Sequence, residues 1–433
     1  MTIIDLSKFQ KVSLSINVSL VYVALGLLIS LQPPFYPSEA EKMGATPAQY
    51  GFVFGIANLS LFIFSPIFGK YGPRLGAKLC FTTGSIFQGV SGFLFAFLPL
   101  LKNCEVFITL SYVLRFAEGF GTAMAWSAAV GILMKLFPNK VAQIMSWTQT
   151  FFGLGYMMGP AVGAALYEVG GFKFPFLVVG SISTILSVSL YFTIPHMDDE
   201  TRHVTLRPDG QEQPRPVLGF RQVLSSFSLL LPFFDLFCTL CGNGVLESML
   251  EPHLRQYKAT TLDVGITFLI FGCCYMSGNV IFGTIADKVG NPTVFSVLGN
   301  CLFLLTFSLI GPVPFVPVKP SVILIQLMMA CAGTAYASMV VSSFGRAHQR
   351  VIKMGFADDL DTRIMITGLW MSAFALGNFV GPTFAGFLVQ SEGFSSTTVV
   401  FFGLYLVMAL VDSAELCQKI VSRRMQNSYE EIP

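Results

Sequence analysis

Two pairs of charged residues stand out inside long apolar runs, where a charge most needs a chemical explanation. Arg115 and Glu118 are three residues apart, and Glu247 and Glu251 are four apart. Both spacings place the two side chains of a pair on one face of a helix. In a run that crosses a bilayer, a central charge costs about 2.5 to 3.5 kcal/mol, so the charges that are retained face a cavity or one another.

The glutamate pair suits the exchange of a proton for a cation. Burial and mutual repulsion both favour the protonated form of a carboxyl group, and groups perturbed in this way are typical of functional sites. Glu247 is therefore the leading candidate for a proton or substrate site, followed by Glu251. An alternative for Glu251 is a place at the outer mouth beside His253, and Asp235 is a weaker candidate nearer the cytoplasmic end.

Arg115 and Glu118 allow more than one interpretation. They are close enough on one helix face to form a structural ion pair. Alternatively, Glu118 exchanges a proton and Arg115 moderates its acidity. A third hypothesis has Arg115 bind a carboxylate, which would make the cargo an organic anion or drug. The candidate acids outnumber this one base, so a cation is the favoured cargo.

The elements that hold these residues are membrane spans. Of the 433 residues, 53% are hydrophobic and only 12% are charged, and the mean hydropathy is +0.68. These values lie far outside the range of soluble domains. Twelve apolar runs have roughly the 20 residues that a bilayer core demands, and the tenth covers 321 to 343. The sequence therefore predicts an all-α polytopic membrane protein with twelve transmembrane helices, six in each half.

One glycine-rich pattern occurs twice. It consists of a glycine four residues before a Gly-Pro pair, with a further glycine beyond the pair: Gly155, Gly159, Pro160 and Gly163, then Gly377, Gly381, Pro382 and Gly386. The two copies are 222 residues apart (381 minus 159), about half the chain. Glycines spaced by four let another helix approach closely, and proline bends a helix. We therefore expect matching gating helices in two similar halves.

The repeat and the loop charges divide the chain. We expect a cytoplasmic N-terminus at 1–12, a six-helix half at 13–194, a cytoplasmic linker at 195–227, a second half at 228–416 and a cytoplasmic tail at 417–433. With both termini cytoplasmic, 19 lysine and arginine residues fall in inner segments and 6 in outer ones, as the positive-inside rule requires. Arg346 is counted among the inner loop residues, and Arg115 is the one base placed inside a span.

A second motif lies in the loop after the second span of each half. Its second copy contains Gly283, Asp287, Lys288 and Gly290, and its first copy has Pro73 at the acidic position. The motif resembles the loop signature of the major facilitator superfamily. The resemblance implies that Asp287 bonds a facing helix and holds the outward-facing state, a lock that Pro73 cannot supply in the first half.

Within that superfamily the chain resembles the vesicular amine transporters, particularly the vesicular polyamine branch. The segments that carry this resemblance include 35–42 after the first span, 76–78 in the loop after the second and 244–247 in the seventh. Segment 115–123 in the fourth span and the Gly-Pro stretch of the fifth resemble patterns of the superfamily as a whole, the latter its antiporter signature. The resemblance implies a proton-coupled antiporter of polyamines or other amines that works by alternating access, in a vesicle or another acidic organelle. The neurotransmitter branch carries acids in the first, tenth and eleventh spans, and this chain has none there, which disfavours serotonin-like and acetylcholine-like substrates.

Two tryptophans stand out from the abundant aromatic residues. Trp147 and Trp370 each precede a Gly-Pro pair by about three helical turns in matching spans. They could form an aromatic cavity that holds an ammonium group by cation–π contact. Ordinary packing between helices is the favoured alternative.

The expected partners are a small organic cation, protons and the lipid bilayer, and the chain is expected to act as a monomer. The sequence has no motif for a cofactor, a metal, a catalytic nucleophile or nucleic acid, so we do not expect an enzyme. The alternative in another functional class is a non-transporting sensor built on the same fold.

Overall fold

The structure is a computed structural model, and it describes residues 8–136, 141–194, 226–289, 291–311, 318, 320–356 and 360–430. The predicted linker, 195–227, lies outside the described residues except for its last two. The predicted domain boundaries therefore stay a prediction.

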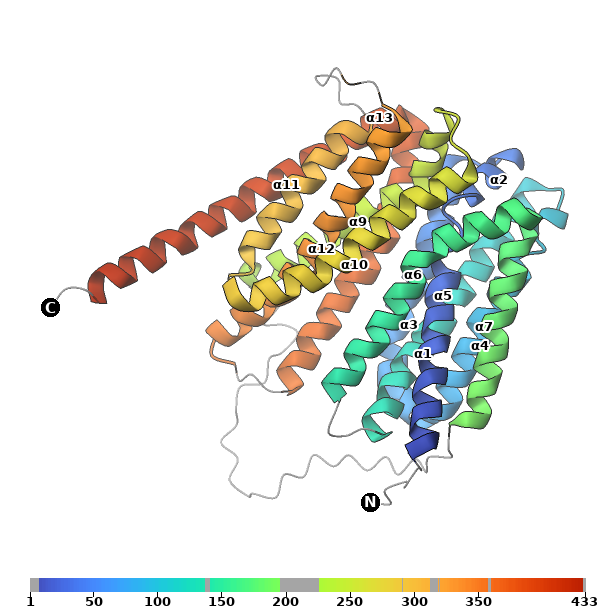
Figure 1. Cartoon of the computed structure of the whole chain (residues 1–433), viewed down its shortest axis with the longest axis horizontal. Helices are drawn as coiled ribbons and strands as arrows, with labels where there is room; N and C mark the ends of the chain where they lie inside the picture. The colour runs from blue at the N-terminus through green and yellow to red at the C-terminus, as the bar shows by residue number, and fades with distance from the viewer. Residues whose placement is uncertain are drawn as a thin grey trace. The chain divides into compact units, whose positions relative to one another are not determined.

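The described residues are helical and contain no strand, which confirms the predicted all-α fold. The first part of the chain contains the long helices α1 (Lys8–Ser30), α3 (Pro47–Leu75), α4 (Ala77–Phe95), α5 (Cys104–Leu136), α6 (Val141–Gly170) and α7 (Lys173–Thr193). Two short helices lie between them, α2 (Tyr36–Lys42) and η1 (Leu98–Leu100). Figure 1 shows α1, α4, α5 and α7 as long rods running alongside one another, and α4 packs against both α5 and α7.

The second part of the chain supplies six more long segments. They are α9 (Phe227–Arg255), α10 (Thr261–Val289), α11 (Thr293–Ile310), α12 (Val322–Lys353) and the two segments of α13 (Leu360–Glu430), which meet at Gly393. Gly393 has φ 81° and ψ 171°, a conformation that is open to glycine and strained for other residues. The twelve long segments in the described residues match the twelve predicted runs.

Most of these helices have the length and hydropathy of membrane spans. Eight helical stretches in the described residues pass both criteria, and Leu14–Ser30 of α1 is a shorter apolar stretch. Hydroxyl side chains inside the helices bond to the carbonyl four residues earlier, as Ser85 does to Phe81 and Thr122 to Glu118, each at 2.8 Å. This local bond satisfies the hydroxyl where water is excluded.

By its contacts the chain divides into two compact units. Unit 1 comprises Met1–Gly210, Gly244–Leu269 and Phe379–Gln390, and unit 2 comprises Gln211–Asn243, Ile270–Asn378 and Ser391–Pro433. The helices α9, α10 and α13 therefore contribute residues to both units. Each unit is described by itself below.

The glycines of the first repeated pattern allow α6 to approach α1. A Cβ atom at Gly155 would meet the backbone of Val23, and one at Gly159 would meet Ser30. A Cβ at Gly163 would meet the carbonyl of Leu31. These contacts are the close helix approach that the spacing predicts.

The second repeated pattern lies in α13 and makes comparable contacts. Within unit 1, a Cβ at Gly386 would lie 2.5 Å from the Pro47 carbonyl oxygen, and Pro382 packs against Gly244 of α9. Within unit 2, a Cβ at Gly377 would lie 2.6 Å from the Cβ of Leu240. Pro160 and Pro382 both lie inside helices that continue past them.

Candidate functional site

Glu247 lies on α9 and has a phenolic partner on α6. The hydroxyl of Tyr156 donates to Glu247 Oε1 at 2.5 Å, and the contact is partly buried in unit 1. Tyr156 follows Gly155, so the close approach of α6 to α1 fixes the segment that carries this hydroxyl. Glu247 was predicted from the sequence, whereas Tyr156 was not, although Tyr156 lies inside the repeated glycine pattern.

Glu251 lies one turn further along α9 and belongs to a different set of contacts. Its Oε1 lies 3.5 Å from Arg255 Nε, and its Oε2 has no hydrogen-bond partner among the described residues. Arg255 also pairs with Glu41 of α2 at 2.5 Å. The Tyr50 hydroxyl donates to Glu41 at 3.2 Å. Arg255 therefore joins the end of α9 to α2 within unit 1.

Arg115 and Glu118 form a buried ion pair on α5. The Arg115 Nη1 to Glu118 Oε2 distance is 2.8 Å, and both residues are 2% exposed. Arg115 also donates to the carbonyl oxygen of Ile29 on α1 at 3.3 Å and to that of Val53 on α3 at 3.4 Å. The pair thus connects three helices, as expected for a structural ion pair. Glu118 Oε1 has no hydrogen-bond partner among the described residues, so a proton role for Glu118 stays a prediction.

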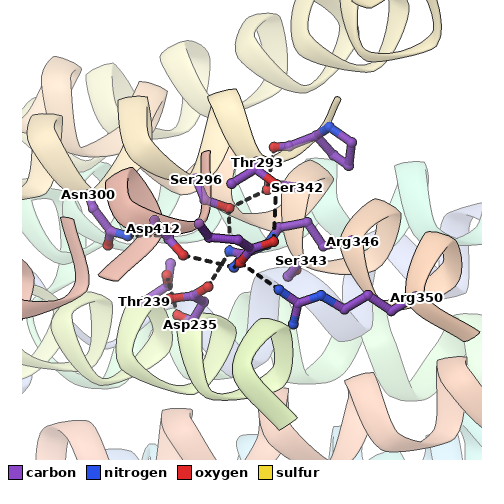
Figure 2. A network of polar contacts seen from close by, with 12 residues as sticks. Asp235, Thr239, Thr293, Ser296, Asn300, Ser342, Ser343, Arg346, Arg350 and Asp412 are labelled. Atoms are coloured by element: carbon purple, nitrogen blue, oxygen red, sulfur yellow. Dashed lines mark hydrogen bonds and ion pairs between the residues drawn. The ribbon is translucent and has the colours of Figure 1, made fainter. Parts of the chain in front are cut away.

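Unit 2 contains a larger charged cluster centred on Arg346 (Figure 2). Arg346 pairs with Asp235 of α9, with Asp412 of α13 at 2.8 Å and with Glu415 of α13 at 2.6 Å. Arg346, Asp235 and Asp412 are each at most 1% exposed. Figure 2 shows the side chains of Asp235, Arg346 and Asp412 pointing toward one another.

Arg346, predicted to lie in an inner loop, is instead a buried residue of α12, and its predicted place on the cytoplasmic side stays a prediction. The tenth apolar run was ended at 343, whereas α12 continues to Lys353. Arg346 lies near the end of its apolar run, where hydropathy alone does not reveal the carboxylates on neighbouring helices that neutralise it. One signal was present: Ser338, Ser342 and Arg346 recur every four residues on one helix face.

Of the two tryptophans of the predicted aromatic cavity, the structure describes the side chain of Trp370. Trp370 donates from Nε1 to Ser343 Oγ at 3.0 Å, stacks on Phe374 with 5.5 Å between ring centroids, and packs against a core cluster that includes Phe233. These contacts agree with ordinary packing. The side chain of Trp147 lies outside the described part of α6. The aromatic cage therefore stays a prediction.

The second loop motif is described only in part. A Cβ at Gly283 would meet no atom within 4 Å, and Lys288 is exposed. Gly290 and the side chain of Asp287 lie outside the described residues. The lock expected from Asp287 stays a prediction.

The chain resembles known transporters along most of its length. The family model described as "Major Facilitator Superfamily" matches residues 18–357. The rat "MFS-type transporter SLC18B1" is 29% identical, covering 89% of this chain and 83% of that protein. The human "Synaptic vesicular amine transporter" is 24% identical, covering 84% of this chain and 66% of that protein.

A solved structure supports the same fold. The crystal structure of a bacterial homologue of the human lysosomal transporter Spinster, in an inward-facing and occupied conformation, gives a TM-score of 0.73. The comparison covers 94% of this chain and 98% of that one at 14% identity.

Proposed function

The chain belongs to the Major Facilitator Superfamily and is a multi-pass membrane transporter, and we propose that it exchanges small organic cations for protons, with polyamines as the preferred cargo. One relative supports an amine as cargo, since it is named a synaptic vesicular amine transporter. A transporter that accumulates cations against protons belongs in the membrane of an acidic vesicle or similar organelle. We propose that both termini face the cytoplasm and that the chain acts as a monomer.

The contact between Tyr156 and Glu247 carries this proposal. An ionised carboxylate attracts an ammonium group, and a protonated one does not. If the proton and the cation compete for Glu247, each binds when the other has left, and exchange follows from that competition. The Tyr156 hydroxyl stabilises the ionised form by donating to Oε1 at 2.5 Å. Glu247 is only partly buried, which suits a group that meets cargo and proton in turn.

The contacts of Arg255 support alternating access. Opening the predicted lumenal side requires the end of α9 to leave α2, and Arg255 joins them through Glu41 at 2.5 Å. Transporters of this kind expose a fixed site by rocking one bundle against the other. We propose that the Arg255–Glu41 pair breaks when the site faces the lumen.

An organic anion as cargo is less well supported. Arg115 already donates to Glu118 and to the carbonyls of Ile29 and Val53. An anion would have to displace a buried partner carboxylate to bind this guanidinium, which leaves that charge uncompensated.

Uptake into proteoliposomes tests the proposed cargo. The purified protein is reconstituted with an acidic interior, and radiolabelled spermidine, a monoamine and an organic anion are offered in turn. We expect gradient-dependent accumulation of spermidine that a protonophore abolishes. Accumulation of the anion alone would contradict the proposal, and so would the absence of uptake for all three compounds.

A further inference from the structure

The buried cluster of unit 2 lies outside the site proposed for cation exchange. Its inner part consists of Asp235, Arg346 and Asp412, and its outer part of Arg350, Glu415 and Lys419. Glu415 is paired with Arg350 at 2.5 Å and with Lys419 at 2.6 Å, in addition to Arg346. The outer side chains retain 12% to 27% exposure, whereas the inner ones retain at most 1%.

Neither part of the cluster is electrically neutral when it is considered alone. Two aspartates share one guanidinium in the inner part, which leaves one excess negative charge if both are ionised. The outer part has one excess positive charge, carried by Arg350 and Lys419 beside Glu415. Solvent screens charges at the partly exposed rim more strongly than those in the buried interior. The inner excess is therefore poorly compensated.

The hydrogen bonds also indicate that the two aspartates of the inner part have too few donors. Both oxygens of Asp412 are occupied, Oδ1 by Arg346 at 2.8 Å and Oδ2 by Asn300 at 2.9 Å. Asp235 accepts from Arg346 through Oδ2, while its Oδ1 has no partner among the described residues. Asp235 and Asp412 both accept from the guanidinium of Arg346, so the two carboxyl groups meet at one buried cation.

We propose that Asp235 and Asp412 hold one proton between them and form a second proton site of the transporter, located entirely in unit 2. Two carboxylates that share one site do not both ionise readily, and one proton balances the single charge of Arg346. The titratable and charged groups facing the pair are Arg346 and Arg350 of α12, Glu415 and Lys419 of α13 and the Cys238 thiol of α9. The use of this proton in transport rests on the proposed function, but its presence does not.

Infrared spectroscopy of the purified protein tests the proposal without any cargo. Spectra are taken at neutral pH for the wild type and for Asp412→Asn and Asp235→Asn. In each variant we expect the intensity of the protonated carboxyl band to fall by the amount due to one group. The intensity of the ionised carboxylate band should not change. Glu415→Gln is the matched control, because Glu415 is surrounded by three bases and should lose ionised intensity only.

The folding of the variants is part of the same test. Asparagine has the shape of a neutral aspartic acid, so each single variant should fold, whereas the double variant leaves Arg346 with Glu415 as its one carboxylate partner in the cluster and should be unstable. Loss of ionised rather than protonated intensity in both single variants would overturn the proposal, as would misfolding of both. Failure of spermidine uptake would leave the infrared result unaffected, which separates this proposal from the proposed function.

Discussion

At the scale of single residues, the chemistry depends on which partner each buried carboxyl group has. Glu247 accepts from a neutral phenol, Glu118 from a guanidinium, and Asp235 shares its guanidinium with a second aspartate. A buried acid that has a guanidinium to itself has little reason to change its protonation state. Glu247 is only partly buried and accepts from a hydroxyl, which suits a group that binds a proton or an ammonium group.

Tyr156→Phe should weaken cation binding. It removes the donor that stabilises ionised Glu247, and a hydrogen bond to a charged group contributes about 1.5 to 3 kcal/mol. The proton then competes better, so the KM for spermidine should rise at least about tenfold, and the pH that gives half-maximal uptake should move upward. The measurement is spermidine uptake at several external pH values, with the exposed Tyr191→Phe as control. An unchanged KM across the pH range would show that the hydroxyl does not act on Glu247.

Arg115→Leu should destabilise the protein, because it leaves Glu118 as an unpaired buried charge, a loss of about 3 to 5 kcal/mol. Combining it with Glu118→Gln should restore most of that stability. Thermal unfolding in detergent measures both variants. Equal destabilisation by the single and double changes would contradict the ion pair. Transport by a stable double variant would assign the pair a structural role, whereas its loss would place Glu118 in the proton path.

At the scale of elements, glycine spacing controls how closely the helices approach. Gly155, Gly159 and Gly163 lie on the face of α6 that contacts α1, while a Cβ at Gly153 of the same helix would meet open space. The sequence predicted this face, because small residues at intervals of four mark a close helix contact.

Gly159→Leu should abolish transport and leave membrane insertion intact. A side chain at this position would overlap Ser30 and force α6 away from α1, which displaces the segment that carries Tyr156. Gly153→Leu is the control on the same helix and should transport normally. Membrane fractionation and uptake measure the two properties separately. Normal uptake by Gly159→Leu would show that the close approach is dispensable.

Part of the candidate site could be predicted from the sequence. Apolar length gave the spans, and charge within a span gave Glu247 and the Arg115–Glu118 pair. Arg346 was missed because it lies just past the end of an apolar run, where hydropathy favours a loop, and only the partners on α9 and α13 make its burial possible. Tyr156 was missed because a tyrosine in an aromatic-rich helix has no distinguishing pattern until the facing carboxylate is known. Tertiary contacts supplied both.

At the scale of the whole molecule, we propose a transporter with two protonatable centres of different character. Glu247 in unit 1 is partly exposed and faces a neutral donor, and it is proposed to meet the cargo. The Asp235–Asp412 pair in unit 2 is sealed around Arg346 and is proposed to hold its proton apart from the cargo. Separate sites would allow more than one proton to drive the uptake of one multiply charged cation.

The measurement that tests the central claim most directly is spermidine accumulation driven by a pH gradient in Glu247→Gln proteoliposomes. Glutamine fixes the neutral form, so neither a proton nor an ammonium group can be exchanged at this position. The exposed Glu105→Gln serves as control for the loss of one acid. The account predicts that accumulation vanishes in Glu247→Gln and persists in the control at equal amounts of reconstituted protein. Full gradient-driven accumulation by Glu247→Gln would contradict it.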